Sequence, residues 1–117
     1  MTIRDVVRVT AAHYGVTVAQ VLGGSRPPRL VEARAMAMFL ARRLLRASYP
    51  EIGRELGKHH TTVLAAVAKA HGRLMDDPVF VRHAVVVTRA LRAREPQVLD
   101  LGDISGELAD LMGGHSS

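Results

Sequence analysis

Residues 48–75 read SYPEIGRELGKHHTTVLAAVAKAHGRLM, and this stretch decides the fold. Ser48 followed by Glu51 is a capping-box pattern, which predicts that a short helix begins here. Gly57 is expected to end that helix, and a second, longer helix is expected to begin near His60. Two helices joined by so short a turn are the parts of a helix-turn-helix.

The sequence on either side of this stretch also predicts helices, because apolar residues recur at helical spacing between capping residues, glycines and prolines. The expected helices cover about residues 3–14, 17–23, 31–47, 48–57, 60–75 and 78–95. The stretch 23–30, GGSRPPRL, is expected to form a basic loop, because it contains two glycines and two prolines. The fold class is therefore all-α, a compact bundle of about six helices that contains a helix-turn-helix and carries a short acidic C-terminal tail.

Each expected helix carries one apolar stripe, and together the stripes are the candidate core. The core is expected to be mainly aliphatic, because aromatic residues make up 3% of the chain and tryptophan is absent. Arg34, Arg42 and Arg46 are expected to point away from it. The stripes consist of Ile3, Val6, Val7, Thr10 and Tyr14; Ala33, Met36, Ala37, Leu40 and Leu44; Ile52 and Leu56; Val63, Val67, Ala70 and Leu74; and Phe80, Ala84, Val87 and Leu91.

The charge of this 117-residue chain is unevenly distributed. All 16 lysines and arginines lie in residues 1–94 together with 6 acidic residues, which gives this part a net charge of +10. Residues 95–117 contain 5 acidic residues and no lysine or arginine. The basic part, expected as one domain over 1–94, favours a polyanionic partner, with nucleic acid ahead of an anionic membrane. The acidic tail over 95–117 is expected to be partly helical or mobile.

Several classes of protein are disfavoured by what the sequence lacks. The absence of cysteine excludes disulfides and thiolate metal sites and fits a reducing cytoplasm, where a nucleoid-associated protein is expected. Neither a secretory signal nor a membrane span is expected. The histidines lack a spacing such as H-E-x-x-H, and G-x-x-x-x-G-K-[ST] is absent, so no metal, nucleotide or other cofactor is expected. The chain is not expected to be an enzyme, because Glu51 and Glu55 beside Arg54 fit a solvated helix face.

In a helix-turn-helix, the first residues of the second helix touch base edges in the major groove. Here these residues are His60, Thr61 and Thr62. A histidine ring offers a donor and an acceptor, and threonine offers a hydroxyl together with a methyl group for the thymine methyl. Lys69 and Arg73 are expected to continue along the exposed face of the same helix.

The basic loop adds a second candidate contact with DNA. Arg26 and Arg29 are expected on an extended segment that prolines stiffen, beside the predicted reading helix. An arginine on an extended arm can enter the narrow minor groove of A·T-rich DNA. The loop and the helix together therefore predict contacts in both grooves of a duplex.

The run from residue 4 to residue 91 resembles domain IV, the C-terminal DNA-binding domain of the bacterial chromosomal replication initiator DnaA. The resemblance rests on AAHYGVTVAQVLGGSR (11–26), RAMAMFLARRLL (34–45) and SYPEIGRELGKHHTTV (48–63). The last of these is the most specific, because the family signature reads Pro-Glu-Ile-Gly and then, after a few residues, Asp-His-Thr-Thr-Val. The resemblance covers roughly three quarters of the chain and does not include the ATPase core of the initiator.

The resemblance implies a ligand, the DnaA box, which is a short, asymmetric, A·T-rich duplex site. It implies that His60, Thr61 and Thr62 read bases in the major groove and that Arg26 lies in the minor groove. It also implies a contact of Arg34 with the DNA backbone. Together with the basic residues that the sequence pattern indicates, the residues expected on the DNA backbone are Arg29, Arg34, Ser48, Pro50, Lys58 and Lys69.

The chain departs from the family pattern at three places. His59 occupies the position of an aspartate that can accept from a cytosine amine, and His59 is itself expected beside the bases. The turn before His60 is one residue shorter than usual. Pro27, Pro28 and Glu32 lie where basic or small residues are common. All three departures leave the exact box sequence open.

Two functions follow from these observations. The first is sequence-specific double-stranded DNA binding at DnaA-box-like sites, which regulates replication initiation or transcription; a chain that starts at Met1 would then bind boxes without the initiator's ATPase. The alternative is a protein-interaction adaptor with the same fold and only nonspecific DNA binding, which captures a replication or regulatory protein through residues 98–112. RNA binding is disfavoured, because few aromatic side chains are present to stack on bases.

Overall fold

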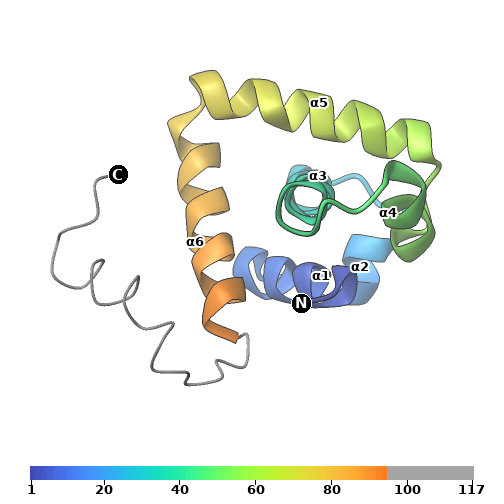
Figure 1. Ribbon diagram of the computed structural model, residues 1–117, viewed down its shortest axis with the longest axis horizontal. Coiled ribbons are helices and arrows are strands. Elements are labelled where there is room, and N and C mark those ends of the chain that lie inside the picture. The colour runs from blue at the N-terminus through green and yellow to red at the C-terminus, as the bar shows by residue number, and fades with distance from the viewer. Residues whose placement is uncertain (95–117) are drawn as a thin grey trace, which may run out of the picture.

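The structure, a computed structural model, describes residues 1–94 of the chain. These residues form helices and connecting turns without any strand (Figure 1). The all-α prediction with its helix-turn-helix, formed by α4 (Tyr49–Leu56) and α5 (His60–Asp76), is confirmed, whereas the predicted acidic tail lies outside the described residues. The helices are α1 (Ile3–Tyr14), α2 (Val18–Leu22), α3 (Pro28–Leu45), α4 (Tyr49–Leu56), α5 (His60–Asp76) and α6 (Pro78–Arg94).

The helix α3 runs through the middle of the bundle, and the other helices surround it (Figure 1). In this view α5 crosses above α3, α6 lies at the left, α1 and α2 lie below, and α4 lies at the right. Met36, Ala37 and Leu40 of α3 are at most 1% exposed. Because isolated helices of this length are marginal in water, the burial of their apolar faces against α3 provides most of their stability.

The apolar stripes predicted from helical spacing form the observed core. Ile3, Tyr14, Leu44 and Leu74 are the members that stay partly buried, at the edge of the core. The capping boxes at Thr2, Thr17 and Ser48 are also present, so each of these helices begins at a side chain that accepts from its own first turn. The fully buried stripe residues include Ile52, Leu56, Val63, Phe80, Val87 and Leu91.

Two expectations about the third helix are wrong. It begins at Pro28 rather than near residue 31, because a proline at the first helical position lacks an N–H that would have no helical partner there. The irregular loop is therefore confined to residues 23–27, and Arg29 lies in the first turn of α3. Arg34, expected to point away from the core, is only 9% exposed.

The helix-turn-helix depends on a close backbone approach at Gly53. The N–H of Lys58 donates to the carbonyl of Gly53 at 2.9 Å, which closes the turn onto α4. A Cβ atom at Gly53 would lie 2.5 Å from the carbonyl oxygen of Lys58. Gly57, at the end of α4, has a φ of 66°, in the left-handed region that favours glycine. Two glycines with different tasks therefore set the angle at which α5 leaves α4.

A cluster of three rings joins the end of α1 to α6. Nε2 of His13 lies 2.7 Å from Nδ1 of His83, and the Tyr14 ring centroid lies 5.0 Å from His13 and 5.2 Å from His83. Such a hydrogen bond needs one donor and one acceptor, so at most one of the two facing nitrogens carries a proton. Burial, followed by the proximity of His83, lowers the pKa of His13, while Glu32 acts in the opposite direction.

Gly53→Ala is expected to lower the free energy of unfolding by about 1–3 kcal/mol, because the added methyl group meets a backbone carbonyl that cannot turn away. Gly72→Ala is the matched control, since Gly72 also lies in a helix but its Cβ would meet nothing within 4 Å. That substitution is expected to stabilise the protein by up to about 1 kcal/mol. Urea unfolding measures the free energy of unfolding of both variants. If Gly53→Ala proves as stable as Gly72→Ala, the turn accommodates the added methyl group without a cost in stability.

Candidate nucleic-acid interface

The helix α5 begins with exposed polar side chains. His59, His60, Thr61 and Thr62, the predicted base-reading residues, are all exposed. His59 is the N-cap residue, and its Nδ1 accepts from the N–H of Thr61 at 3.2 Å. An imidazole therefore takes the place of the carboxylate or hydroxyl that commonly caps a helix. The ring centroids of His59 and His60 are 4.3 Å apart, with 32° between the planes, so the two rings stack beside the start of α5.

The cap determines which nitrogen of His59 is available to a ligand. Because a backbone N–H can only donate, Nδ1 carries no proton, and the ring proton of the neutral imidazole lies on Nε2. Oγ1 of Thr61 lies 2.7 Å from the same Nδ1, so the hydroxyl and the backbone N–H of Thr61 share the one lone pair of this nitrogen, and the hydroxyl oxygen keeps lone pairs for another donor. The helix start therefore presents an N–H donor at His59 and an oxygen acceptor at Thr61.

The side of α5 opposite the core carries small side chains. Val63 and Val67 face the core, whereas Thr61, Ala65 and Ala68 are exposed on the other side of the helix. Small side chains allow a helix to approach base edges closely, and an alanine methyl group can contact the methyl group of thymine. The exposed face of α5 is thus shaped for close approach along its first two turns.

The loop of residues 23–27 is held by the buried guanidinium of Arg34. Its Nε donates to the carbonyl of Val21 at 2.7 Å, its Nη2 donates to the carbonyl of Gln20 at 2.9 Å, and its Nη1 donates to the carbonyl of Ser25. These carbonyls lie at the end of α2 and in the loop, where helical donors run out, and the carbonyl of Gln20 also accepts from the N–H of Gly23 at 3.3 Å. The predicted phosphate contact of Arg34 stays a prediction, and these bonds give the side chain a structural task.

Lys58, in the turn between α4 and α5, reaches the same end of α2. Its Nζ donates to the carbonyl of Gly23 at 2.9 Å and to that of Leu22 at 3.3 Å. A positive charge is favourable where helix carbonyls end without partners. The turn of the helix-turn-helix and the basic loop are therefore linked through Lys58, and its predicted contact with a phosphate stays a prediction.

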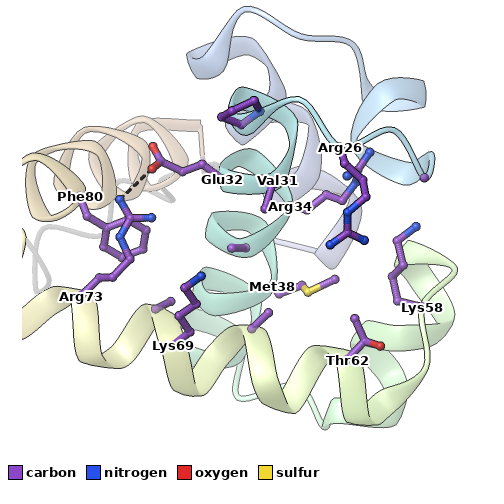
Figure 2. A pocket seen from close by; sticks show the side chains of 15 residues that line it. Arg26, Val31, Glu32, Arg34, Met38, Lys58, Thr62, Lys69, Arg73 and Phe80 are labelled. Carbon is purple, nitrogen blue, oxygen red and sulfur yellow. Dashed lines mark hydrogen bonds and ion pairs between the residues drawn. The ribbon is translucent and has the colours of Figure 1, made fainter.

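The loop and α5 border a groove of about 650 Å³. Arg26 lies on the loop side of this groove, and Thr62 and Lys69 lie on the α5 side. Figure 2 shows that Arg26, Arg34, Lys58 and Thr62 lie around one end of the groove. We call this surface the basic groove. Its apolar floor includes Val31, Ala35, Met38 and Ala66.

Arg73 borders the other end of the basic groove, and the expectation that it extends the exposed face of α5 is wrong. Its Nη2 donates to Glu32 at 2.8 Å, as Figure 2 shows, and to Asp77 at 2.8 Å. The guanidinium also lies 4.3 Å from the ring centroid of Phe80. Two carboxylates offset the charge of Arg73, and its hydrogen bond in turn holds the pKa of Asp77 below its usual range.

Three predicted backbone residues lie outside the basic groove. Ser48 and Pro50 lie at the start of α4, where the Ser48 hydroxyl accepts from the N–H of Glu51 at 3.1 Å. Arg29 is exposed on the first turn of α3. The structure therefore gathers only part of the predicted set in the groove, and the DNA contacts of these three residues stay predictions.

The sequence reasoning missed the apolar floor of the groove and the ion pairs at its end. A signal for the floor existed, because Val31, Ala35 and Met38 recur at spacings of four and three, which places them on one face of α3. A signal for the pair of Arg73 with Asp77 also existed in its i,i+4 spacing. The contact of Arg73 with Glu32 joins segments 41 residues apart, and no local pattern indicates it.

Two other classes of site, a metal centre and a membrane span, are absent from the part of the chain that the structure describes. No group of three or more histidine, aspartate or glutamate side chains there is placed to hold a metal ion. Within residues 1–94, no helix has both the length and the apolar composition that crossing a membrane requires.

Residues 3–70 match a family model described as the bacterial dnaA protein helix-turn-helix. The chromosomal replication initiator protein DnaA of Caulobacter sp. (strain K31) is 39% identical over 93 residues, which cover 79% of this chain and 19% of that protein. The DnaA protein of Xanthobacter autotrophicus is 42% identical over 86 residues, with coverages of 73% and 17%. The DnaA protein of Deinococcus radiodurans is 34% identical over 93 residues, with coverages of 80% and 20%. The chain thus spans about a fifth of the length of these relatives.

The fold, the exposed polar start of α5 and the basic groove define a DNA-binding domain of the helix-turn-helix class. The family match over residues 3–70 shows that the chain belongs to the family of the bacterial DnaA helix-turn-helix domain. The resemblance found in the sequence is therefore confirmed. A helix-turn-helix is a binding module, so membership supports a binding task rather than a catalytic one.

Arg34→Ala is expected to lower the free energy of unfolding by about 2–3 kcal/mol, because three backbone carbonyls each lose a charged donor. Arg29→Ala is the control, since Arg29 is exposed on the same helix and its removal is expected to change stability by less than about 0.5 kcal/mol. Urea unfolding compares the two variants. If Arg34→Ala proves as stable as Arg29→Ala, the loop does not depend on Arg34.

Proposed function

We propose that this protein binds double-stranded DNA sequence-specifically at DnaA-box-like sites. The observation that carries the proposal is the placement of Arg26 and the start of α5 on opposite sides of one basic groove (Figure 2). A helix in the major groove and an arm in the adjacent minor groove must lie on either side of the sugar-phosphate backbone between them. The basic groove offers Lys58 and Lys69 to that backbone, which fixes the register of the protein on the duplex.

The minor-groove contact is assigned to Arg26. Its side chain is exposed, and the loop that carries it is tied to α3 by Arg34 and to the turn by Lys58. A loop that is held before binding loses little conformational freedom when DNA arrives. The narrow minor groove of A·T-rich DNA has an enhanced negative potential, which attracts an inserted arginine.

The major-groove contacts are assigned to the start of α5. The Nε2–H of His59 suits an acceptor such as guanine O6 or thymine O4, and the oxygen of Thr61 suits the amine of adenine or cytosine. His60 adds a second imidazole, and Thr62, on the groove side of the helix, is placed for a base edge or a phosphate. At the helix start the N–H groups of Thr61 and Thr62 already donate to His59, which leaves the N–H of His60 to donate to a phosphate oxygen.

The cellular task that follows is regulation of replication initiation or of transcription. The relatives that the chain matches are named chromosomal replication initiator proteins, and the match covers their helix-turn-helix. A protein that binds the same boxes competes with such initiators or marks sites for them. This task requires sequence-specific binding, because competition at a box needs a preference over the bulk of the chromosome.

Fluorescence anisotropy of the full chain with a DnaA-box duplex and with its scrambled sequence tests the proposal. At ~150 mM salt, where phosphate contacts alone give weak binding, a preference for the box of about 10³-fold or more is expected. Thr61→Ala is expected to weaken box binding by about 1–3 kcal/mol and to leave scrambled DNA unaffected. Thr88→Ala, on α6 and outside the basic groove, is the control.

Equal and weak binding to both duplexes would contradict the proposal. It would favour instead a protein-interaction adaptor that keeps the fold and binds DNA only through its charge. Selection of sites from random DNA then separates an altered recognition code from a lost one, since a lost code yields no preferred sequence.

The capping and reading tasks of His59 are separable by substitution. Aspartate is a good N-cap, so His59→Asp is expected to keep stability, whereas His59→Ala is expected to lower it by about 1 kcal/mol. A carboxylate accepts where the imidazole donates, so His59→Asp is expected to shift the preferred base at one position toward a cytosine. Site selection from random DNA measures this shift, and an unchanged site would show that residue 59 contacts no base.

A further inference from the structure

A second groove lies between the C-terminal half of α3 and α6, and we call it the α3–α6 groove. Its volume is about 490 Å³, and none of the residues that line it also lines the basic groove. Its apolar floor includes Phe39, Leu44, Val81 and Val85, and Val85 is 40% exposed. Contact with apolar side chains would remove this floor from water, which is favourable.

Three arginines, Arg43, Arg89 and Arg92, lie along the α3–α6 groove. Arg43 lies 5.9 Å from the ring centroid of Phe39, and within residues 1–94 none of the three forms an ion pair with a carboxylate. No acidic residue is among those that line the groove. Cations beside an apolar floor are complementary to a segment that carries apolar side chains and carboxylates together.

The chain itself contains a segment of that chemistry. Residues 95–117 hold five acidic residues and no lysine or arginine. Within them, apolar residues recur at spacings of three and four, as on one face of a helix: Leu101, Ile104, Leu108 and Leu111. Each is directly preceded by an acidic residue, which in a helix places the carboxylates along one edge of the apolar face: Asp100, Asp103, Glu107 and Asp110.

We propose that residues 98–112 dock in the α3–α6 groove of the same molecule. The apolar residues of the segment lie against the floor of the groove, and its carboxylates lie beside the three arginines. One segment thus supplies both kinds of complementarity, apolar and electrostatic.

The position of the segment in the chain favours an intramolecular contact. The last two turns of α6 line the groove through Thr88 and Arg92, and the segment follows soon after the end of α6 at Arg94. The stretch from Arg94 to Leu101 spans roughly 23 Å when extended. The helix from Arg94 back to Thr88 covers about 9 Å, so the chain is long enough to turn back. An attached segment also has an effective concentration in the mM range, which a separate partner rarely reaches.

Docking at this place would separate the acidic tail from the DNA-binding surface. The two grooves share no lining residue, so carboxylates beside Arg43, Arg89 and Arg92 leave the basic groove open to phosphates. The tail would then offset positive charge on α3 and α6 instead of competing with DNA.

The test uses the full chain with Ser105→Cys carrying a nitroxide spin label, which is unique because the natural chain has no cysteine. Amide signals of the 15N-labelled protein are compared with the label oxidised and reduced. The signals of Val81, Val85 and Thr88 are expected to lose most of their intensity when the label is oxidised. Those of Thr62 and Lys69 in the basic groove are expected to stay unchanged.

A matched pair of charge reversals on α6 checks the electrostatic part. Arg92→Glu, in the α3–α6 groove, is expected to restore the lost signals, whereas Arg82→Glu, exposed on the same helix outside the groove, is expected to leave them broadened. The amide spectrum of each variant shows whether the fold is intact. Raising the salt to about 1 M shortens the Debye length to about 3 Å and is expected to weaken the broadening.

Three results would overturn the proposal. Unchanged signals throughout would show that the tail does not dock on the described surface. Broadening at Thr62 and Lys69 instead would show that the tail occupies the basic groove and competes with DNA. Broadening that also appears when spin-labelled chains without 15N are mixed with unlabelled 15N chains would show that a second copy takes up the segment.

Discussion

The contact between Gly53 and the carbonyl of Lys58 is the constraint on which the recognition unit depends. A turn can lie directly against the preceding helix only where no Cβ atom separates the two backbones. Because the turn is so close, α5 leaves α4 at one fixed angle, with its polar start in solvent and its apolar stripe on α3. The position of every proposed base-reading side chain therefore depends on the missing methyl group at Gly53, together with the left-handed turn at Gly57.

The same turn also positions the loop that carries Arg26. Lys58 and Arg34 both donate to carbonyls at the end of α2 and in the loop, so two cations stabilise a segment that has no regular structure of its own. Arg34 and Lys58, which the sequence suggests as phosphate ligands, thus stabilise the loop that carries Arg26 through their bonds to backbone carbonyls. Their bonds join the loop to the turn before α5, which the proposed simultaneous contact with both grooves of a duplex requires.

The basic groove and the α3–α6 groove differ in how many of their cations are paired with carboxylates. In the basic groove, Arg73 is neutralised by Glu32 and Asp77, while Arg26 and Lys69 stay exposed to solvent. In the α3–α6 groove the arginines have no carboxylate among the described residues. The first arrangement leaves cations for a phosphate backbone, and the second suits an acidic segment such as the one that ends the chain.

The sequence by itself determined the helices, the turn and the family, because caps, glycines and apolar spacing act within a few residues of one another. It also determined the core faces, such as Phe80, Ala84, Val87 and Leu91, since helical periodicity places them on one side. Within the candidate site, the sequence predicted the polar residues at the start of α5, which the structure exposes. Only the tertiary structure decided that Arg34 is buried and that Arg73 is paired with Glu32. Those outcomes depend on carbonyls and carboxylates that distant segments bring close, and spacing along the chain carries no information about such contacts.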